Sequence, residues 1–222
     1  MAHTVKVKSV RHVTHNVLRI MLEKPEGLTY IPGQAVDISI HKEGWEKEIR
    51  TFTFTSLQDD DYVEVTIKTY PSHNGVTNQL LSLKSGDQIT LYDVYGDIHY
   101  KGEGIFIAGG AGITPFIAIL KKLESENKIG NNKLIFANRA KEDIIDEEKF
   151  RHLLGKNFIN VLSGEKVAGY EHGFITAELI KSQTDGEGKY YYLCGPPPMM
   201  DAVEKELASL GVAEDHIVKE GF

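Results

Sequence analysis

A glycine-rich turn, residues 109–115 (GGAGITP), separates an apolar run from an amphipathic one. The apolar run, residues 104–108, predicts a buried parallel strand, and residues 116–123 are apolar at helical spacing. Glycines let backbone N–H groups approach a ligand, Thr114 is a typical N-cap residue, and Pro115 suits the first helical position. Such a helix N-terminus favours anions, so the turn predicts a phosphate site. Because G-x-G-x-x-P lacks the last glycine of the dinucleotide fingerprint, a tight turn without a ligand is the alternative.

The chain after about residue 102 alternates buried-strand and helix patterns. Strands are expected at residues 104–108, 133–137, 158–162, 190–194 and 217–219, and helices at 115–124, 147–153, 176–180 and 198–210. This alternation predicts a doubly wound parallel sheet, whose ligands bind at the carboxyl ends of the strands. Asn138 and Arg139 follow the second of these strands, and residues 194–196 end the fourth.

The first hundred residues predict antiparallel β structure instead. Alternating segments at residues 4–10, 17–22 and 62–68 are separated by turn sequences, and one helix over 78–83 is expected to start at Thr77. This pattern is typical of an antiparallel barrel or sandwich. The chain is therefore expected to form two domains, residues 1–101 and 102–222, with the seam near residues 100–103.

Composition excludes several classes of protein. A net charge of −7 argues against general nucleic-acid binding. The single cysteine, Cys194, rules out an intrachain disulfide or a four-cysteine zinc site, and the nine histidines show no metal-ligand spacing, so no metal is expected. No apolar run approaches the ~20 residues of a membrane span, and no signal peptide is evident, so a cytoplasmic protein is expected. The acidic run at residues 59–61 is interpreted as a solvated turn.

Six short motifs, in order along nearly the whole chain, together resemble the ferredoxin–NADP reductase superfamily. Arg50-Thr51-Phe52-Thr53 resembles the flavin motif R-x-[YF]-[ST], although alone it could be an ordinary strand with a solvated arginine. The other five are Pro32-Gly33-Gln34, Gly75-Val76-Thr77, Tyr95-Gly96-Asp97, residues 109–115, and residues 193–199 (LCGPPPM). The resemblance implies an N-terminal flavin-binding barrel and a C-terminal nicotinamide-nucleotide-binding sheet.

The resemblance also implies an FAD site on the barrel, with FMN as the less favoured alternative. The implied flavin-binding residues are Arg50, Thr51, Phe52, Thr53, Gly75, Val76, Thr77 and Phe222. Arg50 would pair with a flavin phosphate through its planar fork. Phe52 would stack on the isoalloxazine, where the family more often has Tyr, and Thr53 would offer its hydroxyl near flavin N5, where the family more often has Ser.

On the parallel sheet, the resemblance implies a site for NADPH or NADH. The implied residues are Gly110, Gly112, Ile113, Thr114, Pro115, Asn138, Arg139, Cys194, Gly195, Pro196, Pro197 and Met199. Arg139 favours NADPH, because arginine reads a 2′-phosphate, whereas Glu165 would repel that group. For Cys194, a buried apolar role at the strand end is the alternative to a place under the nicotinamide.

Thr53, Cys194 and Glu220 are the expected catalytic residues. Glu220 and Phe222 match the acid and the terminal aromatic of plant-type members of the family, where the aromatic stacks on the flavin. Gly221 departs from the usual bulky residue, and a frayed tail is the alternative.

The implied function is transfer of electrons from NAD(P)H through FAD to a separate carrier, with flavodoxin or ferredoxin favoured. Because such carriers are usually acidic, a local basic patch is expected, with Lys6, Lys8, Arg11 and Arg19 as candidates. The reductase component of an oxygenase, a free-flavin reductase, and a nucleotide-binding subunit of a larger electron-transfer complex remain alternatives. The oligomeric state is left open.

Overall fold

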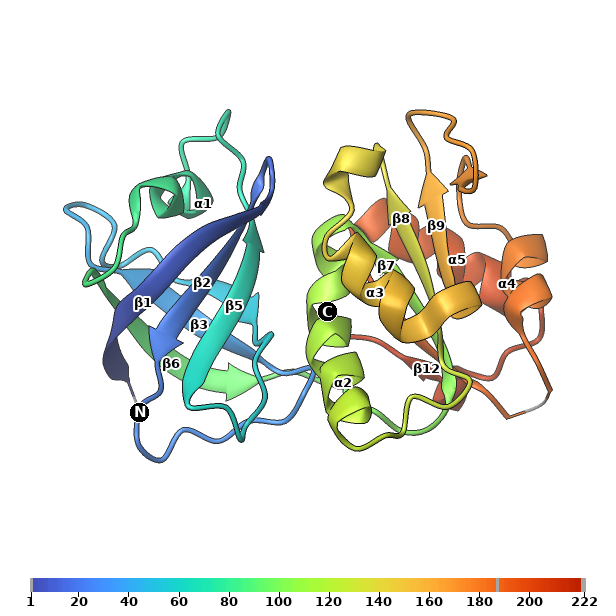
Figure 1. Cartoon of the computed structure of the whole chain (residues 1–222), viewed down its shortest axis with the longest axis horizontal. Coiled ribbons are helices and arrows are strands. Elements are labelled where there is room, and N and C mark those ends of the chain that lie inside the picture. The colour runs from blue at the N-terminus through green and yellow to red at the C-terminus, as the bar shows by residue number, and fades with distance from the viewer. Residues whose placement is uncertain (1, 187, 221–222) are drawn as a thin grey trace.

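The computed structural model describes residues 2–186 and 188–220, and it contains two sheets that lie side by side (Figure 1). The first sheet is built from β1 (His3–Thr14), β2 (Val17–Glu23), β3 (Ala35–Ile40), β4 (Arg50–Thr53), β5 (Tyr62–Lys68) and β6 (Gln88–Tyr95). Its order is β4-β3-β6-β1-β2-β5, and all its pairings are antiparallel. An isolated bridge between Phe54 and Val65 joins the two edges, so the sheet closes into the expected barrel.

A short helix, α1 (Val76–Gln79), continues into the 3₁₀ turn η1 (Leu80–Ser82) above the barrel (Figure 1). The prediction that this helix starts at Thr77 was wrong. Gly75 is the N-cap, with extended backbone (φ −129°, ψ 176°), and the buried Val76 begins the helix. Val76 packs into the barrel core, so the helix begins two residues earlier than it would after a cap at Thr77.

The second sheet is parallel, as the alternating pattern predicted. Its strands are β7 (Gly104–Gly109), β8 (Lys133–Asn138), β9 (Phe158–Leu162), β10 (Glu171–His172), β11 (Tyr190–Cys194) and β12 (Ile217–Val218). They follow the order β10-β9-β8-β7-β11-β12, so the order reverses between β7 and β11. Open sheets bind ligands at such a switch point.

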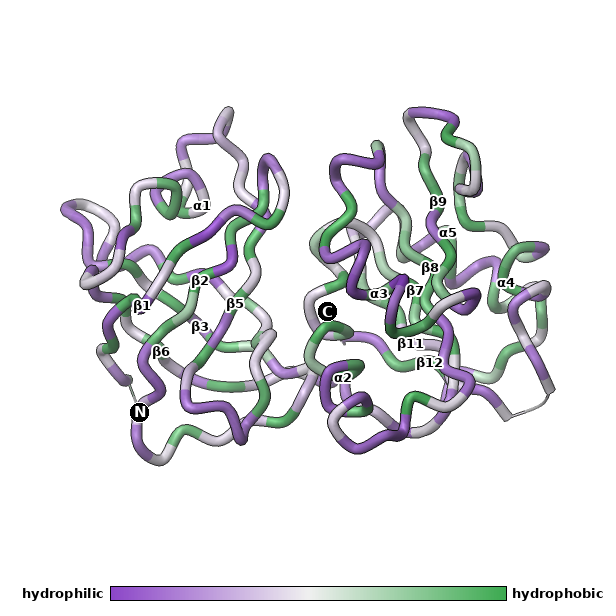
Figure 2. Tube along the Cα trace, viewed as in Figure 1, coloured by the Kyte–Doolittle hydropathy of each residue, from purple (hydrophilic) through white to green (hydrophobic). Residues whose placement is uncertain are grey.

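Helices cover both faces of the parallel sheet. They are α2 (Thr114–Ser125), α3 (Glu147–Leu154), α4 (Ala177–Gln183) and α5 (Pro197–Ser209). One apolar cluster joins Phe116 of α2 and Phe150 of α3 to the strands, and another joins Ile180 of α4 and Leu207 of α5. Hydrophobic segments accordingly gather in the strands and on the inner sides of the helices (Figure 2).

The start of α2 differs from the expectation that Thr114 caps the helix. A 3₁₀ turn, η2 (Gly110–Ile113), precedes it, and Ile113 already has helical backbone angles. Thr114 is therefore inside the helix, and its hydroxyl donates back to the Ala111 carbonyl at 3.0 Å instead of accepting from the helix. Pro115 does lie in the first turn.

The barrel and the parallel sheet share an apolar contact, since Val17 and Ile98 belong to the cluster that contains Phe116. Charged side chains flank it. The acidic run is a turn in which Asp59 and Asp61 are exposed, as expected, whereas Asp60 pairs with Lys121 of α2 at 2.7 Å. The proposed boundary at 101/102 falls between β6 and β7 and remains a prediction. In the described residues, no helix is long and apolar enough to cross a membrane.

Candidate active site

Strand β4 places the flavin motif at the barrel surface. Its pairing with β3 sets Val36 opposite Phe52 and Ala35 opposite Thr53, and both motif side chains are half-buried. Arg50 is exposed, with Nη2 3.2 Å from the Glu48 carboxylate and Nη1 donating to the Ile49 carbonyl at 2.7 Å. Because an exposed ion pair of this kind is weak, the guanidinium is available to a phosphate.

Thr51 of the same motif is engaged within the protein. Its hydroxyl donates to Asp37 Oδ1 at 2.6 Å, and the Tyr95 hydroxyl donates to the same oxygen at 2.7 Å. Burial, followed by the adjacent Asp37 carboxylate, raises the pKa of Tyr95. One carboxylate on β3 thus ties β4 to β6 beside the flavin motif.

The second flavin element lies at the start of α1. The first N–H groups of a helix have no intrahelical acceptor, so Val76 and Thr77 offer two donors next to Gly75. Lys42 Nζ donates to the Gln79 carbonyl at 2.9 Å, which ties the loop before β4 to the end of this helix. The loop that leads to Arg50 and the helix that follows Gly75 are therefore joined directly.

The two loops of the parallel sheet pack against each other at the switch point. A Cβ atom on Gly112 would overlap the Cys194 carbonyl and lie 2.7 Å from Gly195 N, so only glycine fits there. Gly110 has a left-handed backbone, with φ +51°. Ile113, Thr114 and Pro115 are buried behind this contact and support the turn.

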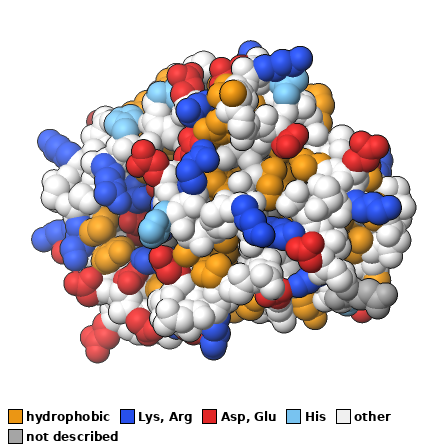
Figure 3. Space-filling model, turned by 45° about the vertical axis from the view of Figure 1, so that its right-hand side comes forward, with side chains coloured by type: hydrophobic (Ala, Val, Ile, Leu, Met, Phe, Trp, Pro, Cys, Tyr) orange, Lys and Arg blue, Asp and Glu red, His pale blue; other side chains and the backbone are white. Residues whose placement is uncertain are grey.

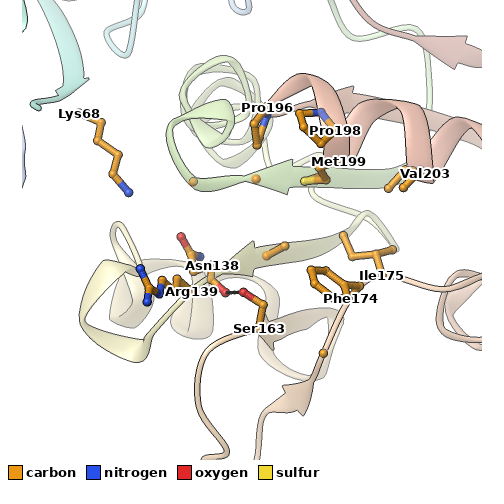
Figure 4. A pocket seen from close by; sticks show the side chains of 15 residues that line it. Lys68, Asn138, Arg139, Ser163, Phe174, Ile175, Pro196, Pro198, Met199 and Val203 are labelled. Atoms are coloured by element: carbon orange, nitrogen blue, oxygen red, sulfur yellow. Dashed lines mark hydrogen bonds between the residues drawn. The ribbon is translucent and has the colours of Figure 1, made fainter. Parts of the chain in front are cut away.

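A cavity of about 390 Å³ opens beside this turn, over the ends of β7, β8 and β9 (Figure 4). Its walls are mostly apolar, with Phe174 and Ile175 facing Pro196, Pro198, Met199 and Val203, and the polar lining residues are Lys68, Asn138, Arg139 and Ser163. Of the predicted nucleotide residues, it is lined by Gly110, Asn138, Arg139, Pro196 and Met199. Among the described residues, the lining omits Gly112, Ile113, Thr114, Pro115, Cys194, Gly195 and Pro197.

Asn138 is the most unusual side chain in this cavity. It is only 7% exposed, and within the described chain neither its amide nitrogen nor its amide oxygen has a hydrogen-bond partner. An unsatisfied buried amide is costly, so a polar ligand group in the cavity would satisfy it. The residues present therefore fit a bound nucleotide.

Glu165 lies in the turn beside the cavity and does not line it. Its carboxylate accepts the Lys141 backbone N–H at 2.5 Å, and it is absent from the described residues that line the cavity. Arg139 and Lys68 do line it. The Glu165 carboxylate keeps its charge in this turn, which packs against Arg139, so the expected repulsion of a 2′-phosphate stays a prediction.

The end of β11 meets the barrel through the carboxyl-terminal segment. Burial, and to a smaller degree the charge of Glu220, raises the pKa of the Cys194 thiol to about 12. Glu220 accepts the Asp97 backbone N–H at 3.2 Å, and a Cβ on Gly96 would lie 3.1 Å from its other carboxylate oxygen. Glu220 thus bridges the turn after β6 and the nucleotide sheet, whereas Phe222 lies outside the described residues.

Several lining residues had no clear signal in the sequence. Lys68 reaches the cavity from the end of β5 in the barrel, a contact that only the domain arrangement creates. Ser163 directly follows β9, and residues at the carboxyl ends of parallel strands are expected to line a ligand site, so its position alone could have indicated a lining role. Phe174 is 82% exposed, and an aromatic residue after Gly173 in a polar loop could have indicated a stacking surface.

Comparison with known protein families agrees with this arrangement. A model described as an FAD-binding domain matches residues 2–129, and one described as an oxidoreductase NAD-binding domain matches residues 106–205. NADH-cytochrome b5 reductase 1 of Aspergillus terreus is 32% identical, covering 92% of this chain and 76% of the relative. The electron transfer component of toluate 1,2-dioxygenase from Pseudomonas putida is 24% identical, covering 97% of this chain and 66% of that protein.

Solved structures of the same fold cover the whole chain. The FAD/NAD-binding domain of a nitric oxide dioxygenase from Vibrio cholerae superposes with a TM-score of 0.87 at 26% identity, covering 99% of this chain and 98% of that one. A ferredoxin NADP⁺ reductase from Neisseria gonorrhoeae, solved with FAD and NADP, gives 0.86 at 21% identity, covering 100% and 99%. With the barrel, the switch-point cavity and both family matches in agreement, the chain belongs to the ferredoxin–NADP reductase-like family of FAD-dependent, NAD(P)H-oxidising flavoprotein reductases.

Proposed function

We propose that this chain passes electrons from NAD(P)H, through FAD on the barrel, to a separate small carrier protein. The observation that carries the proposal is the meeting of Cys194, Glu220 and the Gly96 turn, since it joins the nucleotide sheet to the barrel beside the flavin motif. The flavin, when bound, supplies hydride acceptance and one-electron transfer. The protein supplies binding and orientation, and it places the Glu220 carboxylate beside the turn after β6.

On the barrel, Arg50 binds the flavin phosphate and the first turn of α1 adds backbone donors. Arg50 is exposed and weakly paired, so binding costs it little. Phe52 offers an aromatic face, Thr53 offers a hydroxyl one residue further, and Asp37 holds Thr51 and therefore the strand in register. Glu220 holds a negative charge near the reacting centre, and Cys194 stays a neutral thiol at neutral pH because burial raises its pKa to about 12.

For the nucleotide, we propose a preference for NADPH. Arg139 and Lys68 line the cavity, whereas the described lining includes no acidic side chain. A ribose 2′-hydroxyl is usually read by an acid and a 2′-phosphate by an arginine. The names of the fungal relatives specify NADH, so the ratio of kcat/KM for NADPH and NADH is the deciding measurement. Asn138 satisfies its buried amide on the nucleotide, and Phe174 offers an apolar face to the adenine.

For the acceptor, we propose an acidic one-electron carrier such as ferredoxin or flavodoxin. Lys6, Lys8 and Arg11 are exposed on β1, but Arg19 does not belong to this patch, because it pairs with Asp146 across the domain boundary. On the face shown in Figure 3, basic and acidic side chains are interspersed, so docking there relies on local charge pairs. The relatives named for cytochrome b5 and for an oxygenase make those two acceptors the second candidates.

A panel of acceptors tests this proposal. Purified protein with FAD is mixed with NADPH and with ferricyanide, ferredoxin, flavodoxin, cytochrome b5 or free flavin. We expect ferricyanide reduction together with faster reduction of ferredoxin or flavodoxin than of free flavin, and a rate that falls as salt rises. Reduction of free flavin alone would identify a free-flavin reductase instead. The expected cytoplasmic location remains a prediction for cell fractionation, and light scattering would measure the oligomeric state.

A further inference from the structure

A buried ion pair joins the barrel to the segment that follows the nucleotide-binding end of β8. Arg19 Nη2 of β2 lies 2.5 Å from Asp146 Oδ2, at the start of α3. The two side chains are only 11% and 12% exposed. The β5 edge of the barrel faces α2 and α3 across this boundary (Figure 1). This pair is among the most buried ionic contacts between the two domains.

On the barrel side, Arg19 is held in one orientation. Its Nε donates to the Thr66 hydroxyl at 3.2 Å and lies 3.5 Å from the Glu64 carboxylate. The Thr55 hydroxyl donates to the same Glu64 oxygen at 3.0 Å, so the network extends to the segment that follows the flavin motif. Because Thr66 and Glu64 fix the guanidinium, the group that binds its Nη2 atom is held in a defined position relative to the barrel.

On the nucleotide side, the Asp146 side chain does not cap the helix that follows it. It occupies the N-cap position of α3, yet its side chain caps no backbone N–H there, and its backbone is left-handed with φ +53°. An aspartate at that position would normally accept from its own helix. Its carboxylate is turned across the boundary to Arg19 instead. Asp146 ends the segment that begins with Asn138 and Arg139, and Asp143 in the same segment lies 3.8 Å from Lys68.

We propose that the Arg19–Asp146 pair is a positioning device that sets the nucleotide segment, and hence the nicotinamide, against the flavin on the barrel. The inference rests on the reductase activity but not on which acceptor is used. Hydride transfer depends steeply on the separation and alignment of the reacting atoms. The Lys121–Asp60 pair offers a matched comparison, because it also spans the domains but is 24% and 23% exposed and lies on α2, away from the nucleotide segment.

The test measures flavin reduction by saturating NADPH in anaerobic stopped-flow experiments. The variants are Arg19→Gln, Asp146→Asn, the double variant, Arg19→Lys and the control Lys121→Gln. Asparagine tolerates the left-handed backbone at position 146. We expect each single variant to lower the limiting rate about tenfold or more and to weaken the nicotinamide–flavin charge-transfer absorbance. The double variant should be no slower than either single, and Arg19→Lys should restore part of the rate.

Separate measurements distinguish a positioning role from loss of fold. FAD content and the rate of reduction by dithionite should match those of the wild type, which also shows that the flavin chemistry itself is intact. If Arg19→Gln loses FAD, Asp146→Asn decides the question, since it leaves the barrel unaltered. An unchanged limiting rate in Asp146→Asn, a change in KM alone, or an equal loss in Lys121→Gln would overturn the proposal.

Discussion

The flavin motif on β4 and the nucleotide cavity of the parallel sheet present different chemical groups to a ligand. Around β4, the groups that contact solvent are a guanidinium, hydroxyls and a carboxylate, and the Arg50 side chain is exposed. The nucleotide cavity is lined mainly by glycine, proline and apolar side chains, with Asn138 buried and unsatisfied. Charge-assisted contacts suit a cofactor that stays bound, whereas a close backbone surface suits a substrate that must leave after each turnover.

Gly112→Ala should have the largest effect, and only on the nucleotide side. The added Cβ would overlap the Cys194 carbonyl, so the two loops at the switch point must separate. We expect reduction of the flavin by NADPH to fall more than about a hundredfold, because misplacement by about 1 Å costs that much. FAD content and reduction by dithionite should stay at wild-type levels. Normal NADPH turnover would show that the loops tolerate separation.

Arg50→Ala should weaken the flavin side and leave the cavity intact. Loss of a charge-assisted phosphate contact costs about 1.5–3 kcal/mol, which corresponds to roughly a tenfold to hundredfold rise in the FAD dissociation constant. Fluorescence titration of apoprotein with FAD measures it, and Arg50→Lys should lose less. An unchanged dissociation constant would remove Arg50 from the phosphate site.

Arg139→Ala sharpens the comparison by testing whether a charge selects the nucleotide. Since Arg139 lines the cavity, we expect kcat/KM for NADPH to fall about tenfold while that for NADH changes little. Lys149→Ala, at an exposed site on α3, provides the control. A wild-type preference for NADH above tenfold would contradict the role given to Arg139.

The last expected effect is on stability at alkaline pH, and not on binding or turnover. Burial raises the pKa of Cys194 from its usual value of 9.0 to about 12, so the folded state keeps a proton that the unfolded chain releases above pH 9. Stability must therefore fall as pH rises from 9 to 12, by about 1.4 kcal/mol per pH unit from this group. Denaturant unfolding of wild type and Cys194→Ala should show a difference in stability that shrinks over this range. A constant difference would mean that the thiol is not shielded.

Local patterns predicted most of the fold. The strands β9 and β11 begin and end at the expected residues, because both are buried runs bounded by turns. The strands β3 and β6 were not delineated, since their burial depends on neighbours that close the barrel. Thr77 and Thr114 were assigned as helix caps on propensity alone, but Gly75 caps α1 and Thr114 is already the first residue of α2.

The candidate site was predictable only where its parts are contiguous in sequence. The loops at residues 109–115 and 193–199 pack together as parallel strand ends must. Lys68 and the Arg19–Asp146 pair depend on how the barrel sits against the sheet, which no local pattern encodes. The same holds for Asp60, whose pKa is lowered, against the effect of burial, by hydrogen bonds from Lys121 and the Leu57 N–H.

Anaerobic titration of the purified protein with NADPH tests the central claim most directly. The account predicts a yellow protein with about one FAD per chain, whose visible flavin absorbance bleaches with one equivalent of NADPH and returns on addition of ferricyanide. A colourless protein that binds no added FAD, or a bound flavin that neither NADPH nor NADH reduces, would contradict it.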